Sequence, residues 1–494
     1  MSQATAPIDF RANTQQVPPK MPGAVQKATT RFLGGRAALV EILGQDRWQE
    51  LRQAGHDLRL HAITHIDHYL ERAEREVSKA GGHVHWARDA AEANRILLQI
   101  ARQHQVKLAV KSKSMVTEEI GLNHAMEAAG IRVLETDLGE YIVQLVGVGP
   151  AHIVVPAFHL SKEEIADLFR RKLGVEAPSE AQQLTQIARM KLREEFLSAD
   201  MGISGGNFLV AETGTVVLVT NEGNGRMCTT VPPLHVAVVG IDKVVPDWES
   251  LTVLLKLLAR SATGQKLSCY TSFITGPPQT IEETGPREYH LILLDNGRSR
   301  ILQTPETRET LLCIRCGACL NICPVYNTVG GYAYGWPISG PTGAMLAPQI
   351  LGTKVAGALP FASTLCGACN DICPVKIPIT DILLHLRRRV VEGDAQEGPV
   401  ATAMTRASAT VGALALGTPW LYRLGSRLLK VLQAPFRRDG WLPKLPPPLS
   451  RWTMARPFPA FAADFRGWWR SRSRPLTPPL PLGERDRERG TRES

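Results

Sequence analysis

The pattern of hydrophobic and polar residues changes along the chain. From about residue 23 to residue 103, apolar positions recur at helical spacing. Between residues 107 and 198, short apolar runs alternate with amphipathic stretches, and from residue 202 to about residue 302 short apolar runs between glycine-rich turns predominate. Such alternation predicts an α/β layer fold with a helical lead-in.

Individual elements can be assigned from this pattern. We expect strands at 107–111, 131–135, 141–145, 152–156, 207–211, 215–220, 236–239 and 289–294, and helices at 117–129, 161–171, 180–198, 402–415 and 420–432. Ser161 and Glu164 have the spacing of a capping box, which favours a helix beginning there.

The length of 494 residues is too great for one ordinary hydrophobic core, so several domains are expected. We expect a flexible arm at 1–22, a helical lead-in and α/β domain at 23–302, a cysteine-containing domain at 303–390, a helical and irregular C-terminal region at 391–470 and a disordered tail at 471–494.

Cysteine usage indicates metal binding in a reducing compartment. The chain has nine cysteines, and seven of them lie between residues 313 and 373, whereas a secreted disulfide protein is shorter and spreads them. The N-terminus has no basic region followed by an apolar run, and no segment offers about 18 uninterrupted apolar residues. We therefore expect a cytoplasmic protein.

Positive charge is concentrated near the C-terminus. The formal net charge is +10, and residues 385–474 contain sixteen Lys/Arg and five Asp/Glu. Such a region is either a solvated surface or a contact for a membrane surface, nucleic acid or an acidic partner. Its prolines argue against a groove-reading helix, so no nucleic-acid partner is expected, and tryptophan together with arginine suits a membrane surface. Peripheral contact with the inner membrane is the interpretation that follows.

The first cysteine motif has the spacing of bacterial ferredoxins. Cys313, Cys316 and Cys319 are separated by two residues each, and three residues separate Cys319 from Cys323, which stands directly before Pro324. In this pattern the first three thiolates bind one cluster, and the fourth binds a different cluster.

The second motif repeats the last three positions of the first. Cys366, Cys369 and Cys373 have the spacing of Cys316, Cys319 and Cys323, and Ser363 stands where a fourth cysteine would be. Crossed ligation then assigns Cys313, Cys316, Cys319 and Cys373 to the first cluster and Cys323, Cys366 and Cys369 to the second.

The second cluster therefore lacks a fourth thiolate. It is either a [4Fe-4S] cluster completed by Ser363, water or a small molecule, or a [3Fe-4S] cluster. Zinc also uses paired cysteines two residues apart, but rarely three cysteines within seven residues and a fourth before proline. The pattern favours two iron–sulfur clusters close together, and hence electron transfer.

Other candidate sites are weaker. His61, His65 and His68 share one face of a helix without an accompanying carboxylate cluster, which is typical of surface or packed histidines. Glycine-rich turns at 204–206, 221–225 and 275–278 match no phosphate-binding fingerprint. Cys228 and Cys269 stand apart and are interpreted as small apolar residues rather than ligands.

Several segments together resemble one bacterial family. The segments are 111–115 (KSKSM), 118–123 (EEIGLN), 135–141 (ETDLGEY), 211–215 (AETGT), 221–226 (NEGNGR) and the two cysteine motifs. On these residues the chain resembles the lactate utilisation protein B family, the iron–sulfur subunit of a three-protein system for L-lactate oxidation, from about residue 25 to residue 470.

The resemblance implies a fold, partners and a reaction. The α/β domain is expected to resemble sugar-phosphate isomerases and CoA transferases, and the cysteine domain a two-cluster ferredoxin. The family acts with a second iron–sulfur protein and a third subunit in oxidising L-lactate to pyruvate. The alternative is a redox-sensing or membrane-surface-associated iron–sulfur protein for another 2-hydroxy acid dehydrogenase.

The resemblance identifies no catalytic residue. Five polar residues, Lys111, Lys113, Glu135, Asp137 and Glu140, lie near predicted strand ends, where α/β proteins tend to bind ligands. These side chains equally suit helix caps or ion pairs with one another, so both interpretations stay open.

Overall fold

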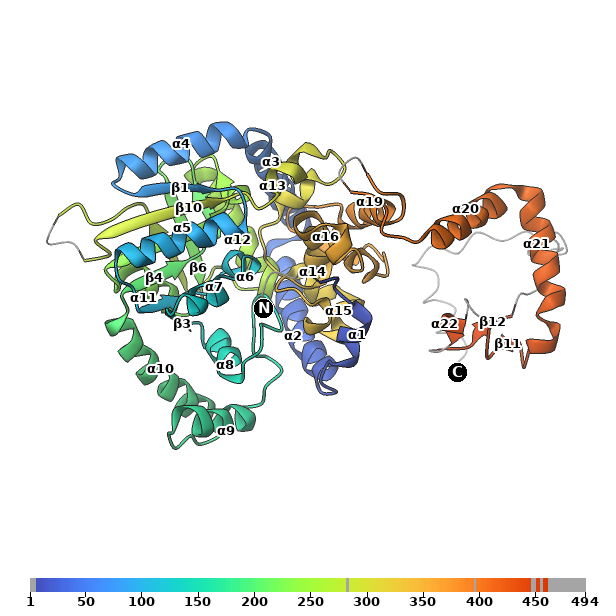
Figure 1. Ribbon diagram of the computed structural model, residues 1–494, viewed down its shortest axis with the longest axis horizontal. Helices are drawn as coiled ribbons and strands as arrows, with labels where there is room; N and C mark the ends of the chain where they lie inside the picture. Colours follow the sequence, from blue (N-terminus) through green and yellow to red (C-terminus); the bar gives the residue numbers. More distant parts are fainter. Residues whose placement is uncertain (1–5, 281–283, 395–396, 446–449, 454–455, 461–494) are drawn as a thin grey trace, which may run out of the picture. The chain divides into compact units, whose positions relative to one another are not determined.

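The computed structural model describes residues 6–280, 284–394, 397–445, 450–453 and 456–460 (Figure 1). These residues form two compact units, the first ending at Val400 and the second beginning at Ala401. The tail that we expected at 471–494 lies outside the described residues, as does part of the basic C-terminal region.

A six-stranded parallel sheet forms the centre of the first unit. Its strand order is β1-β10-β7-β4-β2-β3. The strands are β1 (His83–Ala87), β2 (Leu108–Lys111), β3 (Arg132–Glu135), β4 (Met201–Ser204), β7 (Leu234–Gly240) and β10 (Glu288–Leu294). Every neighbouring pair runs parallel, as in His83↔His290 and Lys111↔Glu135, so all carboxyl ends lie at one edge.

Helices cover both faces of this sheet, because successive strand residues point to opposite sides. One face packs on α5 (Ala90–Gln103), α6 (Met115–Glu119) and α7 (Leu122–Ala128). Part of the other face packs on α8 (Leu138–Val146), α9 (Lys162–Leu173), α10 (Ala181–Ser198) and α11 (Asn224–Thr230).

A smaller sheet extends the core beside the parallel one. Its order is β8-β5-β6-β9, with β5 (Phe208–Val210), β6 (Thr215–Thr220), β8 (Val244–Val245) and β9 (Tyr270–Ile274). The 3-10 helix η1 (Ile241–Lys243) and α12 (Trp248–Thr263) join it, and β5 and β6 are buried in the main hydrophobic core.

The N-terminal helices and the cysteine motifs share that main core. The N-terminal helices are α1 (Phe10–Gln15), α2 (Met21–Leu43), α3 (Gln45–Thr64) and α4 (Ile66–Lys79). Met21, Val25 and Trp48 are buried with the cysteines in one hydrophobic cluster. The lead-in, which we had grouped with the α/β domain, therefore also packs against the cysteine motifs.

The cysteine-containing part, residues 298–392, consists of helices joined by short loops. The helices are α13 (Arg298–Gln303), η2 (Arg308–Leu312), α14 (Ala318–Ile322), α15 (Pro324–Val329), η3 (Tyr332–Tyr334), α16 (Gly340–Leu351), α17 (Thr353–Ala356), η4 (Leu359–Phe361), α18 (Ala368–Ile372) and α19 (Ile379–Glu392). In Figure 1 α14 and α16 lie beyond the carboxyl ends of the parallel strands.

The second unit is helical with one short hairpin-like pair. It contains α20 (Ala403–Gly417), α21 (Pro419–Leu432), η5 (Ala434–Phe436), β11 (Trp441–Leu442), α22 (Ser450–Thr453) and β12 (Phe458–Pro459). In the described part of the chain every helix is too short or too polar to cross a bilayer.

The α/β fold expected from the sequence is confirmed, with local corrections. The predicted strand 141–145 is helix α8, because Asp137 caps its start and the left-handed Gly147 ends it. Residues 152–156 are irregular, and β1 interrupts the lead-in that we expected to be helical throughout. The predicted helix 117–129 is broken into α6 and α7 at the left-handed Gly121.

Part of the expected flexible arm is folded. Residues 10–15 form α1, whose Phe10 ring packs edge-on against Tyr334 with centroids 5.2 Å apart. The backbone N–H of Ile8 also donates to the carbonyl of Val355 at 2.7 Å. The capping box of α9 is present as predicted, with Ser161 and Glu164 bonded reciprocally.

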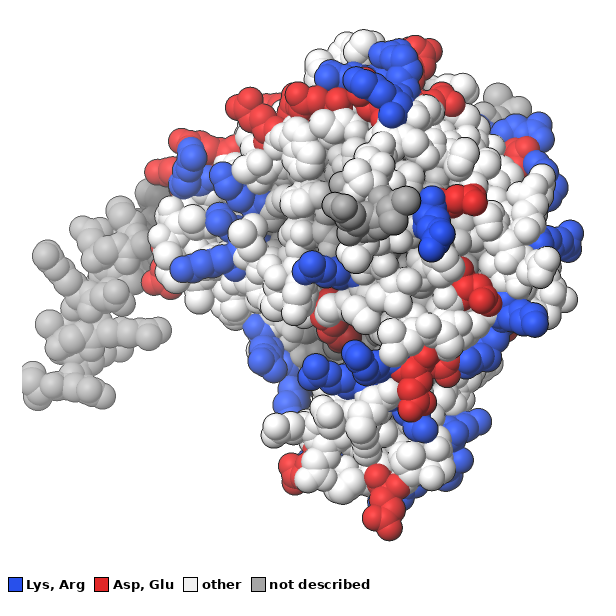
Figure 2. Space-filling model, turned by 90° about the vertical axis from the view of Figure 1, so that its left-hand side faces the viewer, with Lys and Arg blue, Asp and Glu red and all other residues white. Residues whose placement is uncertain are grey.

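The surface of one face is electrostatically mixed. Figure 2 shows the left-hand side of the view in Figure 1, where basic and acidic side chains are interspersed. Among the residues drawn in colour, this face presents no extended area of one sign.

Candidate metal centre

The two cysteine motifs fold as structural repeats fifty residues apart. Gly317 and Gly367 adopt φ of 80° and 83°, and each begins a five-residue helix, α14 and α18. The residue two positions earlier is also left-handed in both, with φ of 58° at Arg315 and 54° at Leu365. In each motif these two left-handed residues flank a cysteine, Cys316 or Cys366, and curl the loop around it.

Four cysteines from both motifs line one cavity. Cys313, Cys316 and Cys319 of the first motif surround it with Cys373 of the second. Apolar side chains complete its wall, among them Met345, Val375 and Ile379. These four are the residues that crossed ligation assigns to the first cluster.

The remaining three cysteines influence one another. Burial, followed by the neighbouring thiols of Cys323 and Cys366, raises the pKa of Cys369 to about 12. Cys323 and Cys369 are buried, whereas Cys366 is exposed. Ser363, which replaces the missing cysteine, accepts a hydrogen bond from the N–H of Leu365 at 3.1 Å.

The buried thiols need a positive partner to ionise. Burial raises the pKa of Cys373 to about 11 and, together with neighbouring thiols, the pKa of Cys319 well above its ordinary value. For Cys313, burial acts in the same direction but Arg315 and Lys243 outweigh it, so its pKa is lowered. Bound metal would supply the positive charge that stabilises the other thiolates.

The spacing of the thiols fits a multi-iron cluster better than zinc. Zinc–sulfur bonds of 2.3 Å in a tetrahedron place the sulfurs about 3.8 Å apart. Among the described residues, which include all nine cysteines, no three cysteine sulfurs lie within 4.8 Å of one another. In an iron–sulfur cluster each thiolate binds a different iron, so the sulfurs stand further apart.

Two buried arginines of α3 hold the backbones of the two motifs. Arg52 donates from Nε and Nη2 to the carbonyl of Cys373 at 3.0 and 2.7 Å. Arg59 is 1% exposed and donates to the carbonyls of Leu311 at 2.7 Å and Leu312 at 3.3 Å, directly before Cys313.

Arg59 also reaches the small sheet, at the carbonyls of Val244 at 2.9 Å and Asp242. Sequence reasoning missed both arginines, because a charged residue on a helix is usually at the surface.

A second polar site lies at the carboxyl ends of β2 and β3. Lys111 is 1% exposed, and its Nζ lies 2.7 Å from Glu135 Oε1 and 3.0 Å from Glu118 Oε1. Glu140 is buried nearby, and its Oε1 has no hydrogen-bond partner among the described residues. We call Lys111, Glu118, Glu135 and Glu140 the Lys111 cluster.

Carboxylates outnumber lysines in the Lys111 cluster. Burial alone would lower the pKa of Lys111, but Glu135 and Glu118 outweigh it and raise that pKa. Burial also raises the pKa of Glu135 despite the neighbouring lysine. For Glu140, burial and then Glu135 and Glu118 raise the pKa well above its ordinary value. The cluster can therefore retain a proton where an exposed glutamate would not.

The two remaining candidates lie beside this cluster. Lys113 Nζ is 3.9 Å from Asp137 Oδ2 and donates to the carbonyl of Val154 at 2.7 Å. Asp137 caps helix α8 by accepting from the N–H of Glu140. All five polar residues singled out from the sequence thus gather at one sheet edge, largely in ion pairs and caps.

The loop at 147–160 connects the polar site with the cysteine motifs. Besides the contact of Val154 with Lys113, a Cβ added at Gly317 would meet Val154 Cγ2 at 3.2 Å. Further along, the hydroxyl of Tyr326 donates to the carbonyl of Ala151 at 2.9 Å. The α/β site and the first cysteine loop are therefore joined by one short segment.

The weaker candidates have structural roles. His61 and His65 lie on the surface with ring centroids 4.5 Å apart and tilted by 41°, while His68 lies on the next helix, α4. Cys228 is buried, with its Sγ 3.3 Å from Thr136 Oγ1, and Cys269 is exposed. Neither of these cysteines lines the cavity of the motifs.

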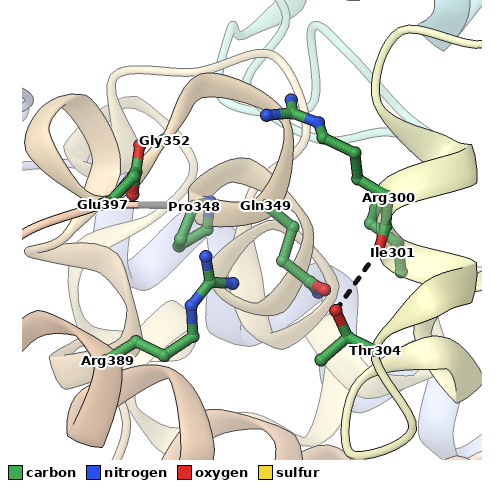
Figure 3. A pocket seen from close by; sticks show the side chains of 8 residues that line it. All are labelled: Arg300, Ile301, Thr304, Pro348, Gln349, Gly352, Arg389 and Glu397. Atoms are coloured by element: carbon green, nitrogen blue, oxygen red, sulfur yellow. Dashed lines mark hydrogen bonds between the residues drawn. The ribbon is translucent and has the colours of Figure 1, made fainter. Parts of the chain in front are cut away.

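A separate small pocket lies between α13, α16 and α19 (Figure 3). Arg300 and Arg389 approach it from different helices. Two of its three charged residues already have partners in the fold, since Arg389 pairs with Asp394 at 2.5 Å and Glu397 accepts from Thr353 at 2.6 and 2.8 Å.

Known families cover most of the chain. A model of the LUD domain matches residues 70–294, and a model of the 4Fe-4S dicluster domain matches residues 309–377, which contain all seven clustered cysteines. The cysteine motifs therefore belong to an iron–sulfur domain.

Two curated relatives extend the similarity to nearly full length. "Lactate utilization protein B" of Shouchella clausii (strain KSM-K16) is 46% identical over 454 residues, covering 91% of this chain and 94% of its own. The protein of that name from Macrococcus caseolyticus (strain JCSC5402) is 46% identical over 456 residues, covering 92% and 94%. A solved DUF162 family protein from Deinococcus radiodurans matches with 16% identity over 46% of this chain and 98% of its own, at a TM-score of 0.27.

The raised pKa of Glu140 predicts a pH-dependent stability. A carboxyl whose pKa is higher in the folded state than in the unfolded state loses its stabilising contribution as pH rises from the unfolded value through the folded value. Glu140→Gln removes this loss. We therefore expect the unfolding free energy of the variant, relative to the original chain, to increase with pH by up to about 1.4 kcal/mol per pH unit.

The measurement is the urea midpoint of both proteins in anaerobic buffer between pH 5 and pH 8. Glu392→Gln, at an exposed glutamate paired with Arg388, is the control and should leave the pH profile unchanged. Parallel profiles for Glu140→Gln and the original chain would contradict the prediction.

Proposed function

Because the chain belongs to the lactate utilization protein B family, we propose that it is the electron-transfer subunit of a system that oxidises L-lactate to pyruvate. The observation that carries the proposal is the single cavity lined by four cysteines of two motifs fifty residues apart. A shared cavity of this kind suits two clusters built from interleaved ligands.

We propose the ligand sets and domain limits as follows. Cys313, Cys316, Cys319 and Cys373 hold one [4Fe-4S] cluster, and Cys323, Cys366 and Cys369 hold a second, which is completed by a non-cysteine ligand or is a [3Fe-4S] cluster. Functionally, residues 303–390 act as the two-cluster domain, residues 23–302 as the lactate-utilisation domain and residues 391–470 as the family's C-terminal region.

The chain's own residues give the two sites different surroundings. Around the first, apolar side chains exclude water, and Lys243 and Arg315 add positive charge. At the second, the exposed Cys366 leaves one side open to solvent. Iron–sulfur clusters accept and release single electrons when bound. This asymmetry favours electron exchange with a partner at the Cys366 side.

Partner subunits are part of the proposal. Oxidation of lactate to pyruvate releases two electrons and two protons, and the chain offers two one-electron sites but no organic hydride acceptor motif. We propose that a second iron–sulfur protein and a third subunit supply the dehydrogenase chemistry and the onward electron path. The carboxylates of the Lys111 cluster, close to the first cysteine loop, would then position the partner's substrate or hold a proton.

Crossed ligation makes opposite predictions for two double variants. With crossed ligands, Cys313→Ser with Cys373→Ser damages one cluster, so iron falls from about eight to about four per chain. Cys313→Ser with Cys323→Ser damages both. If each motif instead held its own cluster, the two results would be exchanged.

Iron and sulfide analysis of anaerobically purified protein, with EPR before and after dithionite, measures these outcomes. Cys269→Ser is the control and should retain all the iron, because Cys269 is exposed and apart from both motifs. About seven irons with a signal in the oxidised protein would identify a three-iron second cluster, and zinc in place of iron would remove the electron-transfer proposal.

The role in lactate oxidation is tested by reduction of the clusters. We expect L-lactate to leave the absorption spectrum of the isolated, cluster-loaded chain unchanged and to bleach it once the partner subunits are added. Bleaching of the isolated chain would place the chemistry in its own α/β domain instead. Reduction by another 2-hydroxy acid but not by L-lactate would favour the alternative substrate.

A membrane surface is the second candidate role, supported by helix α21. Trp420, Leu424 and Leu428 lie on one side of this helix at a spacing of four residues, and they are 63%, 50% and 53% exposed. Arg423 and Arg427 are also exposed and lie on the neighbouring face. An exposed apolar stripe flanked by basic residues is typical of helices that lie in a membrane interface.

We therefore expect the full chain to sediment with vesicles that contain anionic lipid and less with neutral vesicles. Arg423→Glu with Arg427→Glu should weaken this binding at least tenfold. Arg189→Glu with Arg193→Glu, at exposed arginines of α10, is matched in charge and should not. Equal binding of both double variants would remove α21 from the contact.

A further inference from the structure

A cluster of histidines lies at the opposite end of the parallel sheet from the cysteine motifs. Glu288 and His290 are the first and third residues of β10, and His104 is the C-cap of α5. His83 and His85 come from the adjacent edge strand β1, where His83 pairs with His290. Because all strands are parallel, this amino-end edge is separate from the Lys111 cluster at the carboxyl ends of β2 and β3.

Three side chains of this cluster converge on one point. His104 Nε2 lies 3.2 Å from Glu288 Oε2, and His290 Nε2 lies 3.5 Å from the same oxygen. All three ligand atoms lie within 4.8 Å of one another. Around a tetrahedral ion with bonds of 2.0–2.1 Å, the ligand atoms are about 3.3–3.4 Å apart. The distances from Glu288 Oε2 to the two histidine nitrogens are already close to this value.

The buried ring of His290 is aimed at this point without a hydrogen bond. His290 is 7% exposed, and its Nε2 has no hydrogen-bond partner in the described part of the chain. Its other nitrogen, Nδ1, lies 3.0 Å from His85 Nε2. An Nδ1–H that donates to His85 leaves the Nε2 lone pair free, which is the usual arrangement of a metal-binding histidine oriented by an outer partner.

The electrostatics also favour a cation between these groups. A neutral ring in the tautomer described above directs its lone pair at the Glu288 carboxylate. The C-terminal end of α5, a helix of 14 residues, adds a partial negative charge at His104.

We propose that His104, Glu288 and His290 form a binding site for a divalent transition metal ion of the zinc class, with His85 orienting His290. Two imidazoles and a carboxylate are a recognised ligand set for zinc, and water completes the fourth position. The side chains of His104 and Glu288 are 32% and 45% exposed, so the ion has access from solvent. The bound ion would tie the end of α5 to the start of β10.

The test uses the full chain with its iron–sulfur clusters loaded, so that the clustered cysteines are occupied. Zinc is titrated against a competing chromophoric chelator, and the zinc-bound protein is studied by X-ray absorption. We expect one zinc site per chain with nitrogen and oxygen neighbours at about 2.0–2.1 Å and no sulfur at 2.3 Å.

The variants separate this site from adventitious binding. His104→Ala and Glu288→Gln change partly exposed side chains, and each should raise the zinc dissociation constant at least tenfold. His85→Ala should raise it about 10- to 100-fold by releasing His290.

His61→Ala with His65→Ala removes the exposed histidine pair at the end of α3 and should leave the affinity unchanged. Sulfur coordination, or equal affinity of the His104 variant and the original chain, would overturn the proposal.

Discussion

The geometry of the cysteine motifs depends on two buried guanidinium groups of one helix. Arg52 and Arg59 lie seven residues apart on α3, and therefore on one face of it. Arg52 bonds to the backbone of the second motif, and Arg59 to the residues before the first. Between them, His56 Nδ1 lies 3.0 Å from the carbonyl of Val375. Thiol positions follow from backbone positions, so this helix fixes both halves of the metal centre.

The same helix explains why the N-terminal segment cannot be separated from the cysteine motifs. Gly55 approaches Leu257 so closely that an added Cβ would lie 2.3 Å from Leu257 Cδ1. Arg59 contacts the small sheet through Val244 as well as the loop at Leu311. The α/β layer, the N-terminal helices and the cysteine loops thus share one core, which agrees with the single compact unit that ends at Val400.

The sequence predicted the metal-binding chemistry of the cysteine motifs better than the contacts that hold their backbone in place. Cysteine spacing indicated iron–sulfur binding because ligand geometry constrains loop length directly. The role of Arg59 could not be predicted from the sequence, because its partners are carbonyl oxygens up to 253 residues away. Apolar runs misled the strand prediction at 141–145, since a short run cannot distinguish a buried strand from a buried helix. The start of that helix was signalled by Asp137, whose cap outweighs the β-branched residues that follow.

The contact between Arg52 and Cys373 has a consequence for biosynthesis. The two residues are 321 positions apart, so a ribosome adding 5–20 residues per second needs roughly 15–60 s to extend the chain from one to the other. During that interval Arg52 lacks its acceptor at Cys373, whereas the acceptors of Arg59 at Val244 and Leu311 are synthesised earlier. The contact of α3 with the second motif can therefore form only late in the synthesis of the chain, after the α/β domain and the first motif have been made.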